Sequence, residues 1–91
     1  MKTYLISYDL VGHESSPEYS GLTELIKTAP YWVKPLESVW LVKSPLSSAE
    51  MLSQLQSVID MNDRILVIEV TRDWAALNLS GDVVNWMHEG L

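Results

Sequence analysis

The sequence of 91 residues contains no cysteine. Disulfide bridges, thiolate metal sites and cysteine nucleophiles are therefore excluded. The glycine-rich motifs G-x-G-x-x-G and G-x-x-x-x-G-K, which cradle nucleotide phosphates, do not occur. The metalloprotease motif H-E-x-x-H and the hydrolase motif G-x-S-x-G are missing as well. The common enzyme signatures thus assign no activity to this chain.

Basic residues and long apolar runs are also few. Six basic residues stand against twelve acidic ones, which gives a net charge of −6. Because phosphate binding usually requires clustered cations, strong binding of DNA or RNA is not expected unless two protomers pool their cations. The longest apolar stretches, such as Ile65–Ile68, span only four residues. We therefore expect no signal peptide and no membrane span, and a cytoplasmic location by default.

The remaining composition is typical of one small folded domain. Hydrophobic residues make up 47% of the chain and charged residues 20%, which are ordinary proportions for a globular protein. A chain of this size buries about 60 to 65% of its unfolded surface, so there is room for one core only. We expect a single domain over residues 1–91, with its core at 1–70 and a C-terminal extension at 71–91.

The first half of the chain predicts one strand and one helix. Residues Thr3–Leu10 are rich in β-branched and aromatic types and alternate between two faces, which indicates a strand. Ser16 followed by Pro17 is a helix start signal, and Pro30 ends that helix. Gly21 weakens it by about 1 kcal/mol relative to alanine.

The middle of the chain predicts a β-hairpin and a second helix. Tyr31–Val33 and Ser38–Lys43 form the hairpin, in which Pro35 places the first strand at a sheet edge or a bulge. Ser47 and Glu50 then form a capping box, which begins the second helix.

The end of the chain predicts one more strand and a short helix. Arg64–Val70 is the strongest strand candidate, because its four consecutive apolar residues indicate burial on both faces. Asp60–Asp63, before it, is interpreted as a helix-ending turn and not as a calcium loop, since Arg64 occupies the next ligand position. Ser80 can begin a short helix, and Thr71–Leu79 shows no clear element.

This order of elements predicts an α+β domain with a ferredoxin-like β-α-β-β-α-β fold and a C-terminal helical segment. The antiparallel sheet has four strands, and its first and last strands lie side by side at the sheet centre. Helices cover one face, and the opposite face stays open and carries Ser7 and Asp9. Because an exposed apolar patch usually marks a partner surface, we predict a homodimer. The predicted interface residues are Leu5, Trp40, Ile68, Val70 and Trp74.

Few side chains are candidates for chemistry. His13 and His88 lie at opposite ends of the chain and could act in acid-base catalysis, but the favoured interpretation is that they are solvent-facing histidines. Asp9 is the sharpest candidate, because a carboxylate that ends a central strand can bind Mg²⁺. In a two-fold dimer it would meet its own copy. The alternative is a turn aspartate that accepts hydrogen bonds from the following loop.

Two segments carry a family resemblance. The apolar strand that ends in Tyr8 and Asp9, together with Ser38–Val42, resembles the small CRISPR-associated adaptation subunit and its relatives, the VapD-type toxin ribonucleases and the short stand-alone SinR-like bacterial proteins. The element order from residue 1 to about 70 fits these families, and Trp74 and Trp86 are most similar to the stand-alone group. The resemblance implies a ferredoxin-like homodimer whose strand-end aspartates face each other and bind a divalent metal for phosphodiester cleavage, a role that falls to Asp9.

Two hypotheses follow. In the first, the domain is a non-catalytic homodimeric interaction module that binds a protein partner. In the second, it is an Mg²⁺-dependent endoribonuclease in which paired Asp9 carboxylates hold the metal, while Ser7, Tyr8 and Ser38 orient the reacting groups. The segment from Trp74 to Leu91 could pack on its own domain or exchange with the other protomer.

Overall fold

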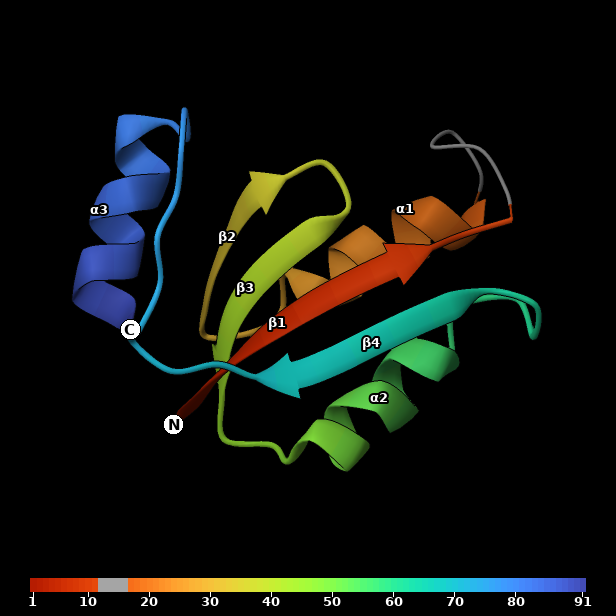
Figure 1. Cartoon of the computed structure of the whole chain (residues 1–91). Helices are drawn as coiled ribbons and strands as arrows, with labels where there is room; N and C mark the ends of the chain where they lie inside the picture. Colours follow the sequence, from red (N-terminus) through yellow and green to blue (C-terminus); the bar gives the residue numbers. More distant parts are fainter. Residues whose placement is uncertain (12–16) are drawn as a thin grey trace.

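The computed structural model describes residues 1–11 and 17–91, so His13 and the predicted cap Ser16 lie outside the described residues. The described part contains four strands and three helices in the order β-α-β-β-α-β-α (Figure 1). Their bounds are β1 Lys2–Asp9, α1 Pro17–Ile26, β2 Tyr31–Leu36, β3 Val39–Ser44, α2 Ser48–Gln56, β4 Arg64–Glu69 and α3 Gly81–Gly90. None of these helices is long and apolar enough to cross a membrane.

The strands form one antiparallel sheet in the order β2-β3-β1-β4. The predicted α+β class with a four-stranded antiparallel sheet is therefore confirmed. The first and last strands are neighbours, as expected, but β4 lies at an edge of the sheet and not at its centre. The two-sided burial predicted for β4 is accordingly wrong, because Leu66 and Ile68 are 56% and 49% exposed.

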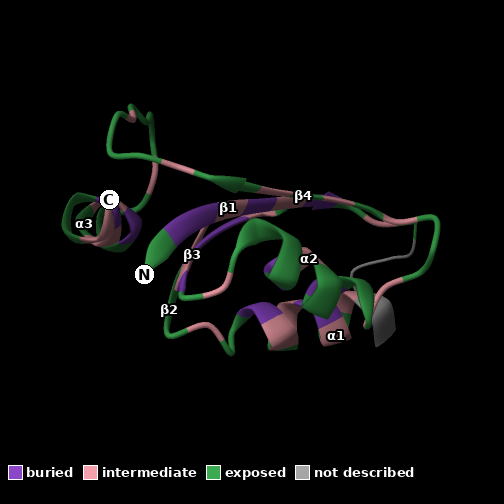
Figure 2. Ribbon diagram, turned by 90° about the horizontal axis from the view of Figure 1, so that it is seen from below, coloured by how far each residue is buried: buried purple, intermediate pink, exposed green. Residues whose placement is uncertain are grey.

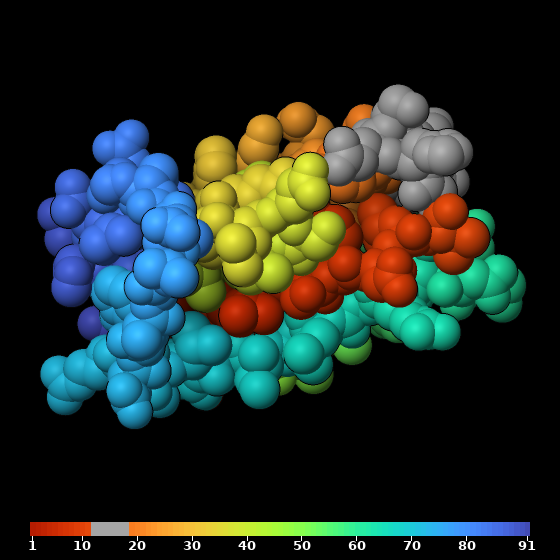
Figure 3. All heavy atoms as spheres, turned by 45° about the horizontal axis from the view of Figure 1, so that its top comes forward, coloured from red at the N-terminus to blue at the C-terminus, as the bar shows by residue number. Residues whose placement is uncertain are grey.

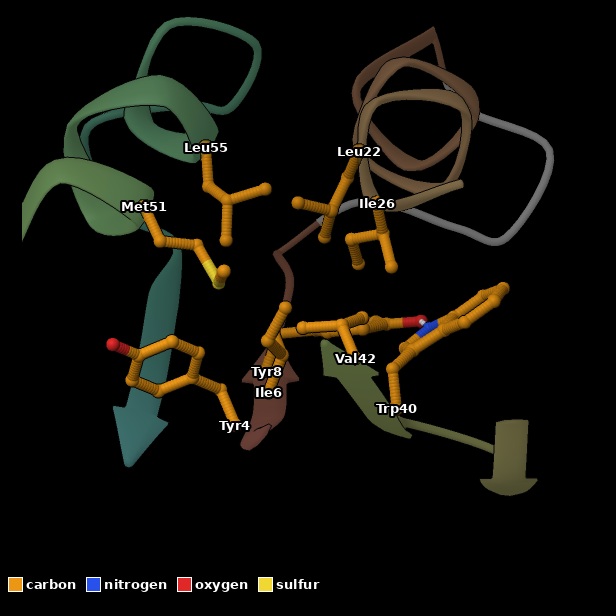
Figure 4. Close-up of a cluster of buried hydrophobic side chains, with 9 residues drawn as sticks. All are labelled: Tyr4, Ile6, Tyr8, Leu22, Ile26, Trp40, Val42, Met51 and Leu55. Carbon is orange, nitrogen blue, oxygen red and sulfur yellow. Dashed lines mark hydrogen bonds between the residues drawn. The ribbon is translucent and has the colours of Figure 1, made fainter. Parts of the chain in front are cut away.

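Helices α1 and α2 cover the same face of the sheet (Figure 2). Alternate residues of β1 and β3 point toward them, because successive side chains of a strand point to opposite faces. Together with residues of the two helices they form the main core (Figure 4). Its buried members are Tyr4, Ile6, Tyr8, Leu22, Ile26, Trp40, Val42, Met51 and Leu55.

Local signals explain where α2 begins and where β2 bends. The Ser47 hydroxyl accepts a hydrogen bond from the Glu50 amide at 3.1 Å, and the Glu50 carboxylate accepts one from the Ser47 amide at 3.0 Å. This confirms the predicted capping box. The pairing of β2 with β3 shifts between Val33 and Leu36, around Pro35. The predicted edge strand with a bulge is thus confirmed as well.

The C-terminal extension packs against its own sheet, on the face opposite α1 and α2. Ser80 caps α3 by accepting a hydrogen bond from the Val83 amide. Buried Val83 and Met87 then contact Leu41 of β3, and the chain before α3 rises above the sheet (Figure 2). A second, smaller core results, and the face predicted to be open is covered at one end. The other members of this cluster are Leu5, Val33, Val70, Trp74, Leu79, Trp86 and Leu91.

Candidate functional site

Asp9 is an exposed residue at the C-terminal end of β1. The pairing of β1 with β4 places it directly opposite Arg64. Ser7, two residues earlier on the same strand face, lies opposite Leu66. These residues line a shallow hollow of about 240 Å³ at the end of the two strands. A carboxylate, a guanidinium group and a hydroxyl are therefore brought to one place on the face that the helices leave uncovered.

The turn role suggested for Asp9 concerns a loop whose residues 12–16 lie outside the described part, and another aspartate bonds to the described part of that loop. Asp63 accepts a hydrogen bond from the Val11 amide at 2.8 Å and, with its second oxygen, one from the Asp60 amide at 2.9 Å. Among the residues that the structure describes, no hydrogen bond or ion pair reaches the Asp9 carboxylate. Asp63 thus ties the loop after β1 to the turn before β4. The predicted turn at Asp60–Asp63 contained this residue, but no sequence signal connects it to Val11.

In the described part of the chain, the surroundings of Asp9 do not form a cluster of metal ligands. Nowhere in the described ranges do three or more histidine, cysteine or acidic side chains cluster closely enough to hold a metal ion. The residue opposite Asp9 is the cation Arg64, which neutralises a carboxylate and does not add a ligand. The described residues of one chain thus offer no cluster of ligands around Asp9.

The three residues predicted to assist Asp9 are separated by the strand alternation. Tyr8 is buried on the helix side, where its hydroxyl accepts a hydrogen bond from the Trp40 indole at 3.1 Å (Figure 4). Ser38 is exposed in the turn between β2 and β3, and its carbonyl accepts a hydrogen bond from the Tyr8 amide. Of the three, only Ser7 lies on the same strand face as Asp9, although Tyr8 also borders the hollow.

The predicted interface residues also divide between the two faces. Trp40 is 2% exposed and lies in the main core, so it is not available at a surface. Its neighbour Leu41 points to the opposite face of the sheet, where it lies opposite Leu5 of β1. Leu5 and Val70 are half-buried against the extension, Trp74 is a half-buried residue of the extension itself, and Ile68 is exposed.

An apolar groove of about 590 Å³ lies between the sheet and the segment that leads to α3. Exposed Leu36 and Leu77 stand on its two sides, with exposed fractions of 57% and 83%. Figure 3 shows the C-terminal segment crossing one end of the sheet, beside the hairpin of β2 and β3. Sequence reasoning missed this groove, because residues 71–79 carry no regular pattern. Other lining residues are Leu5, Val39, Leu41, Trp74 and Leu79.

Two lysine side chains contact aromatic rings. The Lys34 ammonium lies 5.3 Å from the centre of the Trp40 ring and 3.2 Å from the Tyr19 hydroxyl. The Lys27 ammonium lies 5.6 Å from the Trp32 ring. Both contacts are cation–π interactions, and they sit on the α1 and β2 side of the molecule. These cations are thus not gathered around Asp9, where a phosphate would need them.

No protein-family model matches the sequence, and no solved structure matches the chain. The family resemblance of β1 and β3 therefore stays a prediction.

Proposed function

We propose that this protein is a non-catalytic homodimeric interaction module of the CRISPR-adaptation-subunit-like superfamily. The observation that carries the proposal is that the uncovered sheet face has exposed apolar side chains at both edges, Leu66 and Ile68 on β4 and Leu36 on β2. Exposed apolar surface of this kind usually marks a site of contact with a partner. The adjoining groove gives the same face a surface for a protein partner.

The ferredoxin-like assignment belongs to the same proposal. Its support is the element order β-α-β-β-α-β, in which β1 pairs with both β3 and β4. The strand order β2-β3-β1-β4, with β1 between β3 and β4, is the further support for this assignment.

Sedimentation velocity at micromolar concentration tests the dimer. We expect the wild-type chain to sediment at twice its mass of 10.3 kDa. Leu66→Lys should sediment as a monomer with an unchanged circular dichroism spectrum, because Leu66 is exposed and a lysine there leaves the core intact. The matched control is Met61→Lys, which adds the same charge at a residue that is 94% exposed and away from the sheet face. A monomeric wild type would overturn the proposal.

The alternative is an Mg²⁺-dependent endoribonuclease that uses Asp9. It is favoured by one observation: the Asp9 carboxylate is exposed and accepts no hydrogen bond from the described residues. The test is Mg²⁺-dependent cleavage of RNA by wild type, Asp9→Asn and the control Glu69→Gln, which removes another exposed carboxylate. Loss of cleavage in Asp9→Asn alone would favour the nuclease. Equal residual cleavage in all three proteins indicates a contaminant and leaves the interaction module.

A further inference from the structure

The two edges of the sheet differ in how they are protected. The β2 edge carries Pro35 and a bulge, and α3 packs against it. Prolines, bulges and covering helices are the usual means by which proteins prevent a sheet edge from pairing with another chain. The β4 edge has neither a proline nor a bulge: Arg64–Glu69 contains no proline, and its pairing with β1 is continuous over six residues, while α2 packs against β4 from the helix-covered face.

The register shows which backbone groups of β4 face outward. The Val70 amide donates to the Thr3 carbonyl at 2.9 Å, so Thr3 and Val70 form a hydrogen-bonded pair. Such pairs alternate along an antiparallel ladder. Leu66 and Ile68 therefore also bond to β1. The amides and carbonyls of Ile65, Val67 and Glu69 point away from the sheet, and no other strand of the described chain pairs with them.

We propose that the β4 strands of two copies pair antiparallel along this edge, with Val67 on the two-fold axis. In this register Val67 pairs with its own copy, and Ile65 pairs with the second copy's Glu69, so the outward groups of β4 bond to one another. On the uncovered face, Leu66 lies opposite the second copy's Ile68. The two most exposed apolar side chains of β4 thus cover each other. The inference rests on the homodimer in the proposed function and gives it a geometry.

Charge selects this register over its neighbours. The two β4 strands must keep the same side chains on the uncovered face. One strand can therefore slide along the other only in steps of two residues. One shift places Asp63 opposite the second copy's Glu69. The other places Arg64 opposite the second copy's Arg72. Asp63 and Arg72 flank the strand, and like charges that face each other across a ladder are destabilising. Over the same range, residues 61–73, the register centred on Val67 places no like charges opposite each other.

This dimer has a consequence for Asp9. Strands lie about 4.8 Å apart and rise about 3.3 Å per residue. Asp9 lies one strand inward from the edge and, opposite Arg64, three residues along from Val67. The two Asp9 residues are then about 25 Å apart, which is too far for a shared metal ion. The edge dimer therefore belongs with the interaction module and not with a nuclease of paired aspartates.

The absence of cysteine makes a disulfide test specific. We would mix Leu66→Cys and Ile68→Cys proteins, oxidise them mildly and identify the disulfide products by mass. In the proposed register these positions form a pair that is not hydrogen-bonded, with Cα atoms about 4.5 Å apart, within the range of a disulfide. Two copies of the same variant would place their cysteines about 7 to 8 Å apart. We expect the mixed disulfide to exceed either same-residue disulfide roughly tenfold.

Met61→Cys, mixed with each variant, is the control for random oxidation. If the wild type sediments as a dimer but same-residue disulfides dominate, or no disulfide forms beyond the control, the edge register is wrong and the homodimer stands. If the wild type sediments as a monomer, the homodimer itself is wrong. Circular dichroism of both cysteine variants confirms that they are folded, which the exposure of both positions leads us to expect.

Discussion

Tyr8 and Asp9 are neighbours in sequence that serve opposite faces of one strand. The pair was predicted to act together at a site, yet Tyr8 is buried in the main core and Asp9 is exposed. The Trp40 indole, which can only donate, gives its hydrogen bond to the Tyr8 hydroxyl. At the residue scale, Tyr8 is thus a core residue whose hydroxyl accepts a buried hydrogen bond.

Tyr8→Phe should destabilise the protein by about 1 to 3 kcal/mol, because it leaves the buried Trp40 N–H without this acceptor. Urea unfolding followed by tryptophan fluorescence measures the change. Tyr31→Phe removes a hydroxyl from a tyrosine that is 56% exposed, and should change the stability by less than about 0.5 kcal/mol. Equal unfolding midpoints for the two variants would contradict the structural role of this hydrogen bond.

Glu50 makes the stability of α2 depend on pH. Hydrogen bonds from the backbone and then the side chain of Ser47 lower the pKa of Glu50 below its ordinary value. A carboxylate with a lowered folded-state pKa stabilises the native state above its unfolded pKa, and this stabilisation is lost as the pH falls through the folded pKa. The wild type should therefore lose the contribution of this cap below about pH 4.3.

Glu50→Gln keeps an acceptor oxygen for the Ser47 amide but does not titrate. The difference in unfolding free energy between wild type and Glu50→Gln should favour the wild type at pH 7 and shrink toward pH 3. Taking this difference removes the contributions of the other carboxylates, which both proteins share. A difference that stays constant with pH would show that the charge of Glu50 has no part in the cap.

At the element scale, the sequence predicted best what is decided locally. The capping box needs only Ser47 and Glu50, and the bulge in β2 needs only Pro35, so both were predictable. The position of β4 was not predictable, because four consecutive apolar residues are found in central strands and also in edge strands that pair with another chain. Trp40 was assigned to the wrong face for a related reason: the β1–β3 register, which pairs it with Ile6, depends on long-range contacts.

At the element scale, Gly21 destabilises α1, and the structure leaves room for an alanine at this position. A Cβ atom at this position in α1 would lie 3.4 Å from the Val58 Cβ, which is ordinary contact. Gly21→Ala should therefore raise the stability by up to about 1 kcal/mol, by restricting the unfolded chain and favouring the helix. The thermal midpoint reports this change. Gly90→Ala is the contrast, since its Cβ would approach Trp86 at 3.2 Å; a higher midpoint for that variant alone would contradict the argument.

At the scale of the whole molecule, the C-terminal extension determines how much of the sheet is exposed. Its path could not be predicted, because residues 71–79 have no periodic pattern and the turn into α3 uses Asn78 with a φ of 62°. Asparagine tolerates this left-handed conformation better than most residues. The extension covers Leu5 and Leu41 and leaves β4 uncovered. The fold and the candidate dimer surface thus depend on the same segment.

We expect the second core to unfold without unfolding the main core. Val83→Asp buries a carboxylate between α3 and Leu41, and should destabilise the attachment of α3 by about 2 to 4 kcal/mol. An acidic residue in the first turn is otherwise favourable to a helix, so the loss reports packing. Asn85→Asp adds the same charge to the exposed side of α3 and serves as the control.

Hydrogen exchange measured by mass spectrometry locates this effect. In Val83→Asp, amides of residues 71–91 should lose protection, while those of β1, β3 and α2 keep it, because the main core does not include α3. In Asn85→Asp both regions should stay protected. Simultaneous loss of protection across the whole chain of Val83→Asp would show instead that the two cores unfold as one unit. The extension would then be an integral part of the domain, because residues 1–70 would not fold without it.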